Sequence, residues 1–406
     1  MTGALNGIRV VDFTWNVAGP EMTRILADLG ADVIKVEYEG RLDALRLSHP
    51  LPGDGASPNR APLFTDVNRN KRGVTVNIFH PDGMALVKRL IAMSDVVAEN
   101  FSSRVMERWG LDYSGLAAIK SDIIYVSLSG FGHSGRDRDY TTYGPTAQAL
   151  SGLTAMCGLP GKPPAGIGFS YLDHFAGYYG AAAVLLALHY REQTGNGQYI
   201  DISQLEVGLT LTGTAILDAT VNGRPYCRKG NRETDERSAP HGIYPCAGHD
   251  AWCAISVFSD AEWSALCDVL GASALAHDLR FASTDTRLAN QDALDPAIAE
   301  LTVSWDAYAL MEGLQAHGVA AGVVQSPQQR VDRDPQLRSR SAFWEMDHPE
   351  LGRRLFTGSP LRLSETPARP RAPSPLLGQH NGQVYRELLR LNEEEITRLQ
   401  EEGAIA

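Results

Sequence analysis

The chain has 406 residues, 43% hydrophobic and 21% charged, which is ordinary for a globular protein with room for more than one core. Its 37 Lys and Arg are outnumbered by 48 Asp and Glu, and the formal net charge of -11 argues against binding to nucleic acid or to an anionic membrane. A polyanionic ligand would therefore need a local cluster of basic side chains.

The N-terminal sequence and the cysteines bear on where the protein works. Residues 1–7 lack a basic segment leading into an apolar run, and no stretch reaches the roughly eighteen uninterrupted apolar residues of a membrane span. The five cysteines form no C-x-x-C pair, which is typical of reduced thiols rather than of a disulfide framework or a zinc site. We expect a soluble, cytoplasmic protein that needs no metal.

Apolar periodicity predicts alternating strands and helices in the first half of the chain. In chain order, we expect strands at 8–12, 33–37, 74–76, 96–98, 123–127 and 199–202, and helices at 20–29, 81–93 and 173–190. Alternation of this kind is typical of a parallel sheet covered by helices, so the predicted fold class is α/β. The run at 173–190 is almost wholly apolar and rich in Ala, which predicts a buried helix.

A second, smaller α/β unit is predicted further along. The composition becomes polar and irregular around 222–238, where we place a domain boundary. Beyond it we expect a strand at 252–257 and helices at 260–270, 292–301 and 305–315. Residues 360–375 are rich in Pro and should be extended, and 394–402 should form a charged amphipathic helix.

Asp173 stands at the head of the long apolar run. A carboxylate there faces the positive end of the helix dipole and unpaired backbone N–H groups, which favour its ionised form. Asp is also a common helix cap, so position alone is compatible with a structural or a catalytic role. Gly177 and Gly180 lie on one face of the same helix and permit close approach by another segment or by a ligand.

Two further places could bind an anionic ligand. A basic cluster directly before the strand at 74–76 could hold phosphates, with a solvated loop as an equal contender; it includes Asn70, Lys71 and Arg72. Asn100 and Phe101 follow the strand at 96–98, where the carboxyl edge of a parallel sheet binds ligands, and Arg104 and Arg108 come next.

Several familiar catalytic patterns are missing from the sequence. No G-x-G-x-x-G follows the first strand, and there is no Walker loop, H-E-x-x-H, G-x-S-x-G or zinc-spaced set. His133 and His174 are possible acid–base groups, although a loop or packing role is the more common use of such histidines.

Several short, separated stretches of the sequence indicate which protein family the chain resembles. They are GIRVVDF at 7–13, AGP at 18–20, LGADVIKVE at 29–37, NKR at 70–72, ENF at 99–101, GNGQ at 195–198 and LGQH at 377–380. Each is weak alone, but their order and spacing from Leu5 to the C-terminus resemble the class III CoA-transferase family, which includes formyl-CoA transferase and carnitine CoA-transferase relatives.

The resemblance implies roles for particular residues. It places the family nucleophile on Asp173 and makes coenzyme A a substrate. The positions expected to contact CoA are Val17, Ala18, Tyr38, Asn70, Lys71, Arg72, Asn100, Phe101, Arg104 and Arg108. The family often has a basic residue where Tyr38 stands, so a diphosphate contact at that position is not expected to be kept.

The resemblance also implies an architecture. Residues 1–221 should form most of a large Rossmann-like domain, residues 222–325 a small domain, and residues 326–406 the return to the large domain. Relatives interlock as dimers, so we expect a homodimer or a heterodimer with a homologous chain. Formyl-CoA transferase folds a glycine-rich loop over its intermediates. The corresponding residues 230–237 have lost those glycines, so we expect a different lid and a larger acid whose second carboxylate could meet Arg232 or Arg237.

The reaction implied by the resemblance moves CoA from an acyl-CoA donor to a free carboxylic acid through aspartyl anhydride and aspartyl-CoA thioester states. One alternative is an α-methylacyl-CoA racemase, which needs a His–Asp pair; Gly144 occupies the position of that His. A second alternative is the active subunit of a heteromeric transferase, because Asp173 is retained.

Overall fold

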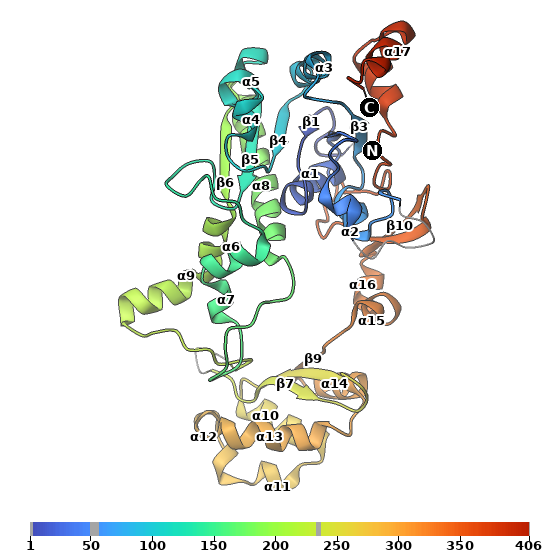
Figure 1. Ribbon diagram of the computed structural model, residues 1–406. Helices are drawn as coiled ribbons and strands as arrows, with labels where there is room; N and C mark the ends of the chain where they lie inside the picture. Colours follow the sequence, from blue (N-terminus) through green and yellow to red (C-terminus); the bar gives the residue numbers. More distant parts are fainter. Residues whose placement is uncertain (1–2, 49–56, 233–236, 406) are drawn as a thin grey trace. The chain divides into compact units, whose positions relative to one another are not determined.

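The computed structural model describes residues 3–48, 57–232 and 237–405, which divide into two compact units (Figure 1). The large unit consists of Met1–Thr154, Gly166–Arg224 and Gln336–Ala406, and the small unit of Ala155–Ala165 and Pro225–Pro335. The sequence placed the boundaries at 221/222 and 325/326. Residues 155–165, which the sequence assigned to the large domain, belong to the small unit.

A six-stranded sheet forms the centre of the large unit, with the order β3-β2-β1-β4-β5-β6 and every neighbouring pair parallel. The strands are β1 (Arg9–Asp12), β2 (Asp32–Glu37), β3 (Arg72–Thr75), β4 (Val96–Glu99), β5 (Ile124–Ser129) and β6 (Tyr199–Ser203). The predicted parallel α/β sheet is thereby confirmed. Because the strand order reverses between β1 and β4, the carboxyl ends of these two strands mark the place where such folds bind ligands.

Side chains alternate between the two faces of this sheet, and each face contributes buried residues to a hydrophobic core. On one face Val11, Ile34 and Val97 join a core with the C-terminal residues. On the other face Val10 and Val33 join a core with α1 (Ala18–Asp28) and α8 (Tyr171–Thr194).

The helices of the large unit begin and end at recognisable sequence signals. They are α1 (Ala18–Asp28), η1 (Ala44–Leu47), α2 (Pro62–Val67), α3 (Pro81–Ala92), α4 (Val105–Arg108), α5 (Tyr113–Ile119), α6 (Gly144–Leu150), α8 (Tyr171–Thr194), α9 (Gln204–Asn222), η3 (Gln383–Leu388) and α17 (Glu393–Glu401). Two more, α7 (Leu153–Met156) and α16 (Pro335–Ser339), contain the residues where the chain passes from one unit to the other. His80 caps α3 by accepting the Asp82 N–H, and Gly195, with φ of 75°, ends α8.

Helix α8 packs closely on α1 because two glycines remove the side chains between them. A Cβ on Gly180 would lie 2.5 Å from Sδ of Met22, and one on Gly177 would lie 2.8 Å from Cγ of Glu21. Of the two roles predicted for these glycines, close approach by another segment is the one observed.

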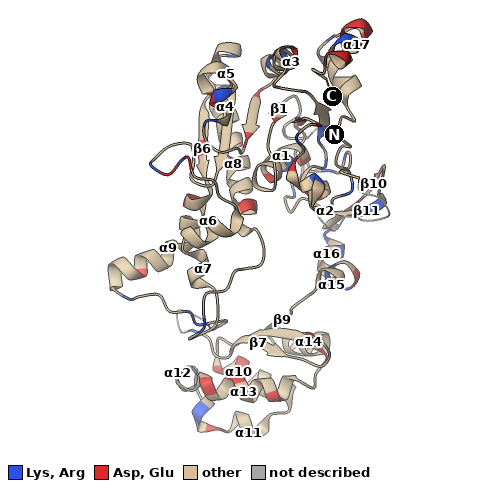
Figure 2. Cartoon of the chain, in the orientation of Figure 1, with Lys and Arg blue, Asp and Glu red and all other residues tan. Residues whose placement is uncertain are grey.

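The prediction that α8 is a buried helix is correct for one face only. Leu172, Ala176 and Val184 are buried, whereas the side of α8 that carries Leu186 is exposed in this chain, with Leu186 at 70%. Figure 2 shows how few charged residues α8 and its neighbour α9 carry. The almost wholly apolar sequence of 173–190 therefore includes a second apolar face, which the rest of the large unit does not cover.

The C-terminal part of the chain covers β3, the edge strand of the sheet. The Gly73 N–H donates to Nδ1 of His380, and Oδ1 of Asn381 accepts the Thr75 N–H at 2.9 Å. The Tyr385 hydroxyl donates to the Thr75 carbonyl. An antiparallel hairpin of β10 (Phe343–His348) and β11 (Gly352–Thr357) precedes this segment.

The small unit has an antiparallel sheet of order β7-β8-β9 with its own core. Its elements are β7 (His241–Pro245), β8 (Trp252–Ser256), α10 (Asp260–Leu270), α11 (Ser273–Ala276), η2 (Leu279–Phe281), α12 (Thr284–Ala289), α13 (Gln291–Thr302), α14 (Ala307–Ala316), β9 (Ala320–Val323) and α15 (Pro327–Asp332). All five cysteines lie in the described part of the chain as free thiols. Among the described helices, none has the length and apolar character needed to cross a bilayer.

Candidate active site

Three loops meet at the carboxyl edge of the large sheet. The first follows β1, the second follows β4 with Asn100 and Phe101, and the third follows β5 and runs to Gly144. Asn100 joins the first two, because its side chain accepts the Trp15 N–H at 2.7 Å and donates to the Trp15 carbonyl at 2.8 Å. This clamp fixes the walls of two cavities.

The larger of these cavities has a volume of about 670 Å³ and aromatic walls. The Phe101 ring lies 5.7 Å from that of Trp15 and 5.4 Å from that of Trp109, both edge to face. The residues that line this cavity include Trp15, Tyr38, Arg41, Phe79, Phe101, Arg108 and Trp109. Flat aromatic walls of this kind suit a planar or extended organic ligand.

The charges around the large cavity favour an anion. Its two acidic lining residues are already bonded, Glu37 to Arg46 and Asp139 to Arg104. Arg41 stacks on Trp15 at 5.4 Å, and Nε of Arg108 donates to the Arg104 carbonyl. Neither Arg41 nor Arg108 is bonded to a carboxylate within the described residues, so both guanidinium groups remain available to phosphates.

The second cavity, about 100 Å³ in volume, contains Asp173 and is called the Asp173 cavity below. It shares Phe101, Ser102 and Thr141 with the large cavity, so the two adjoin. A ligand in the large cavity can therefore extend one end to the Asp173 carboxylate.

Asp173 lies within the first turn of α8 and is not its cap. The helix begins at Tyr171 and Ser170 holds the cap position, which corrects the expectation that Asp173 precedes the helix. Nε2 of Gln204 donates to Oδ1 of Asp173 at 2.6 Å. Burial raises the pKa of Asp173, although the hydrogen bonds from Gln204 and Ser170 act in the opposite direction. The pKa of Asp173 thus shifts in the direction opposite to the one expected from its place at the helix N-terminus, because desolvation outweighs these bonds.

Gly144 lies directly against the second oxygen of Asp173. A Cβ at this position would be 2.8 Å from Oδ2. This is the position at which the racemase alternative requires a histidine, and here it carries no side chain. No side chain at position 144 therefore covers Oδ2.

A network of buried charges lies on α1, and one of its members contacts α8. Arg24 is bonded to Glu21 and to Asp28, and Asp28 is bonded to Arg69 at 2.7 Å. Nδ1 of His174 lies 3.7 Å from Glu21. Burial raises the pKa of Glu21, but the bond to His174 and the Arg24 charge outweigh it and lower this pKa to about 2. Glu21 is therefore a fixed negative charge beside His174, the residue that follows Asp173 in α8.

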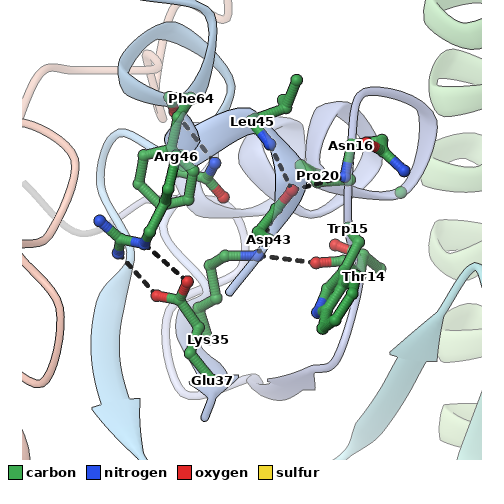
Figure 3. A network of polar contacts seen from close by, with 12 residues as sticks. Thr14, Trp15, Asn16, Pro20, Lys35, Glu37, Asp43, Leu45, Arg46 and Phe64 are labelled. Atoms are coloured by element: carbon green, nitrogen blue, oxygen red, sulfur yellow. Dashed lines mark hydrogen bonds and ion pairs between the residues drawn. The ribbon is translucent and has the colours of Figure 1, made fainter. Parts of the chain in front are cut away.

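A second buried network fixes the loop after β1 (Figure 3). Nζ of Lys35 donates to the Thr14 carbonyl at 2.6 Å and lies 3.5 Å from Asp43. Asp43 in turn accepts the N–H groups of Asn16 and Leu45. Beside them Arg46 pairs with Glu37. Cavity-lining residues of this loop are thus held by groups that solvent does not reach.

Comparisons with known proteins agree with this geometry. The model of CoA-transferase family III matches residues 5–381. The chain belongs to CoA-transferase family III. Over 403 residues it is 34% identical to a succinyl-CoA–D-citramalate CoA-transferase of Chloroflexus aurantiacus, covering 99% of this chain and 98% of the relative.

Other relatives match the chain over a similar share of its length. The chain is 33% identical over 386 residues to a succinate–glutarate CoA-transferase of Agrobacterium fabrum, with 95% of each chain covered. It is also similar to the crystal structure of a CAIB/BAIF family protein from Brucella suis, with a TM-score of 0.88, 32% identity, and 96% and 100% of the two chains covered.

Most of the residues that the CoA-transferase resemblance named lie at these cavities. Asp173, Val17, Ala18 and Asn100 line the Asp173 cavity, and Phe101 lines both. Tyr38 and Arg108 line the large cavity. Arg104 borders two smaller neighbouring cavities and pairs with Asp139 at 2.8 Å.

The basic cluster at Asn70, Lys71 and Arg72 has partners inside the protein instead. Lys71 is fully buried, and its amine lies 3.0 Å from Asp12. Asn70 donates to Asp28, and Arg72 pairs with Asp32 at 2.6 Å. None of the three is among the described lining residues of either cavity, so their predicted contact with CoA stays a prediction.

The other predicted side chains also have defined surroundings. Nε2 of His133 lies 3.2 Å from the Phe101 carbonyl, and burial lowers the pKa of this imidazole. The ring of His174 stacks on Phe169. In the small unit, Arg232 pairs with Asp292 and Asp295. The rest of the expected lid includes Glu233, Thr234, Asp235 and Glu236, which lie outside the described residues.

Sequence reasoning missed several residues of the site, chiefly Gln204, Arg41 and Arg138. A signal for Gln204 was present, because it follows β6 at the same carboxyl edge that singled out Asn100. Arg41 and Arg138 lie in loops, where no periodicity indicates the direction of a side chain.

Proposed function

We propose that this protein transfers CoA from an acyl-CoA donor to a free carboxylic acid, with Asp173 as the covalent nucleophile. The observation that carries the proposal is the placement of a partly desolvated carboxylate in a small cavity adjoining a larger, aromatic one with two available guanidinium groups. The family membership supplies the reaction class.

CoA is expected to occupy the large cavity. Arg41 and Arg108 suit its phosphates, and the rings of Phe79, Phe101 and Trp109 suit its base or the arm that leads to the sulfur. The shared wall at Phe101 and Thr141 would bring the thioester to Asp173. In this assignment the phosphates of CoA are bound by Arg41 and Arg108, which line the cavity, and not by the buried amine of Lys71.

The chemistry then proceeds by four acyl transfers. A carboxylate oxygen of Asp173 attacks the thioester carbonyl, the C–S bond breaks, and an aspartyl acyl anhydride and CoA thiolate form. The thiolate attacks the Asp173 carbonyl, which releases the first acid and leaves an aspartyl-CoA thioester. The incoming carboxylate attacks the aspartyl carbonyl of this thioester and expels CoA thiolate, which gives a second anhydride. The thiolate then attacks the carbonyl of the incoming acyl group, which forms the new acyl-CoA and frees the Asp173 carboxylate.

The surroundings of Asp173 suit this sequence. Partial desolvation makes its carboxylate more basic, and the Gln204 bond at Oδ1 leaves Oδ2, beside Gly144, as the attacking oxygen. The small volume of this cavity, about 100 Å³, also limits access of water to the activated intermediates. Gly144 offers no imidazole for α-proton exchange, which favours transfer over racemisation.

We further propose that the acids are dicarboxylic. Relatives are named for succinate with glutarate, and for succinyl-CoA with citramalate or mesaconate. A screen of acyl-CoA donors against mono- and dicarboxylic acceptors, read by mass, identifies the pair. Transfer only to monocarboxylic acids would reject this part of the proposal.

A dimer, either of this chain or with a homologous chain, is also part of the proposal. It is supported by the exposed apolar face of α8 and α9, and one relative is named as a beta subunit. Light scattering on the isolated chain should give twice the mass of one chain. A stable, active monomer would reject the dimer, and an inactive monomer activated by a homologous chain would favour the heteromeric form.

The covalent step is tested with hydroxylamine. Incubation with acyl-CoA and then hydroxylamine should leave a hydroxamate on the peptide that contains Asp173, because only an activated carbonyl reacts in this way. The Asp173→Asn enzyme should fold and bind CoA but lose transfer by about three or more orders of magnitude. Near-normal transfer by a folded Asp173→Asn enzyme would reject the mechanism.

A further inference from the structure

The Asp173 cavity contains one cationic side chain in addition to its carboxylate. Of its described lining residues, Arg138 is the only Lys or Arg. Arg138 belongs to the loop between β5 and α6, whose end carries Gly144 beside the Asp173 carboxylate. The loop and the first residue of α6 thus bring a guanidinium group and the Gly144 side of the nucleophile to one small cavity.

Within the described residues the guanidinium of Arg138 makes only one long ion pair, and 41% of its side chain is exposed. Its nearest acidic oxygen is Oδ1 of Asp139 at 4.0 Å, and Asp139 is already bonded by Arg104 and by the Ser103 hydroxyl. Arg136 of the same loop, by contrast, pairs with Asp137 through two bonds of 2.9 Å. In the described part of the chain, Arg138 has no hydrogen-bond acceptor of its own.

A second polar group of this cavity is also without a partner. The Ser129 hydroxyl at the end of β5 is buried and has no hydrogen-bond partner among the described residues. Buried polar groups are normally bonded, so the unpaired Ser129 hydroxyl indicates a missing polar partner at this cavity. The guanidinium of Arg138, which solvent reaches, can bind an anionic group of the same ligand.

We propose that Arg138 binds the distal carboxylate of a dicarboxylic acyl group while Asp173 attacks its thioester carbonyl, with the Ser129 hydroxyl as a second donor. The inference rests on the proposed function and makes Arg138 the residue that selects dicarboxylic substrates. The planar fork of an arginine matches a carboxylate through two parallel bonds. A monocarboxylic chain would instead place methyl hydrogens against the cation and leave it unpaired.

The phosphates of CoA are a less suitable partner for Arg138. Arg138 lines the Asp173 cavity and not the large cavity, which has Arg41 and Arg108 for phosphates. On its other side Arg138 borders a small cavity with His133 and Tyr125. A ligand that reaches both Arg138 and Asp173 must therefore carry its second anion at the acyl end.

The test compares succinyl-CoA with butyryl-CoA, which has the same number of acyl carbons and no second carboxylate. The ratio of kcat/KM for succinyl-CoA to that for butyryl-CoA should fall about 30- to 300-fold in Arg138→Gln, and Arg138→Lys should recover part of it. The matched control is Arg136→Gln in the same loop, because Arg136 is highly exposed and outside the cavity.

A second measurement needs no turnover. Calorimetry gives the affinities of succinyl-CoA and butyryl-CoA for the Asp173→Asn enzyme and for the same enzyme with Arg138→Gln added. Loss of the preference for succinyl-CoA on adding Arg138→Gln supports the proposal. An equal loss for both donors would assign Arg138 to CoA instead, and an unchanged ratio would reject any role in selection. If the parent enzyme transfers CoA among acids without preferring succinyl-CoA, the inference alone fails. If it binds both thioesters yet transfers neither, the proposed function fails.

Discussion

Gln204 donates a 2.6 Å hydrogen bond to Oδ1 of Asp173 and joins the first residue of α9 to the first turn of α8. This bond orients the carboxylate and opposes the rise in its pKa that burial causes. Gln204 is therefore a positioning residue for the proposed nucleophile.

Replacing Gln204 by Ala should lower kcat about 10- to 100-fold with little change in KM for acyl-CoA. Since the lost bond had lowered the pKa of Asp173, the acidic limb of the kcat/KM profile should move to higher pH. Steady-state rates over a pH series measure both effects. Gln193→Ala, on the exposed end of α8, is the control, and an unshifted profile would argue against the assigned role.

Gly180 should tolerate no side chain, because its Cβ would lie 2.5 Å from Sδ of Met22. We expect Gly180→Ala to lower the free energy of unfolding by about 1–3 kcal/mol through overpacking of α1 against α8. Gly213 lies within α9 and a Cβ there meets no atom within 4 Å, so Gly213→Ala should be neutral or stabilise by up to about 1 kcal/mol. Chemical denaturation of the two variants makes the comparison, and equal effects would contradict the packing described here.

Glu99 should make stability depend on pH. Burial raises the pKa of this carboxyl to about 8, against the bonds from the Phe101 N–H and the Tyr125 hydroxyl. Between pH 4.5 and 8 the unfolded chain has released this proton and the folded chain retains it, so the Glu99 contribution to stability falls as pH rises.

The Glu99→Gln variant removes this titration and keeps the shape of the side chain. It should therefore gain stability relative to the parent as pH rises from 5 to 8, by on the order of 2 kcal/mol. Thermal melts at both ends of the range test this. A constant difference between parent and variant would mean that Glu99 is ionised throughout.

For Lys71, the sequence and the structure lead to different expectations. If Lys71 holds CoA, Lys71→Ala raises KM for acyl-CoA in a stable protein. The structure instead predicts a loss of about 3–5 kcal/mol in the free energy of unfolding, because Asp12 would remain buried without its partner. Arg72→Ala, which breaks a partly exposed pair, should cost about 1 kcal/mol or less. Urea melts together with acyl-CoA titrations decide between them.

Local sequence patterns predicted the sheet well, because its strands are short and rich in β-branched residues, and all of them except β6 are largely buried. The helix at 260–270 begins and ends where predicted, since Ser259 caps it and Gly271 ends it in the left-handed conformation. The hairpin of β10 and β11 was missed, because its strands are largely exposed and show no apolar alternation.

The site was predictable only where chemistry follows a strand end or a family motif. Asn100 was found in this way. Lys71 was placed with the ligand contacts because a run of basic residues looks the same whether it faces solvent or a buried carboxylate. Which of these applies depends on Asp12, 59 residues earlier in the chain.

The bonds that His380, Asn381 and Tyr385 make to β3 bear on how this chain is synthesised. When the ribosome has produced all six strands, β3 still exposes its unpaired backbone groups, and it continues to do so while more than 150 further residues are added. An uncovered edge strand can pair with another nascent chain. Completion of the large unit must therefore wait for the last tenth of the chain, so premature termination after the small unit would leave a folded small unit attached to an aggregation-prone large one.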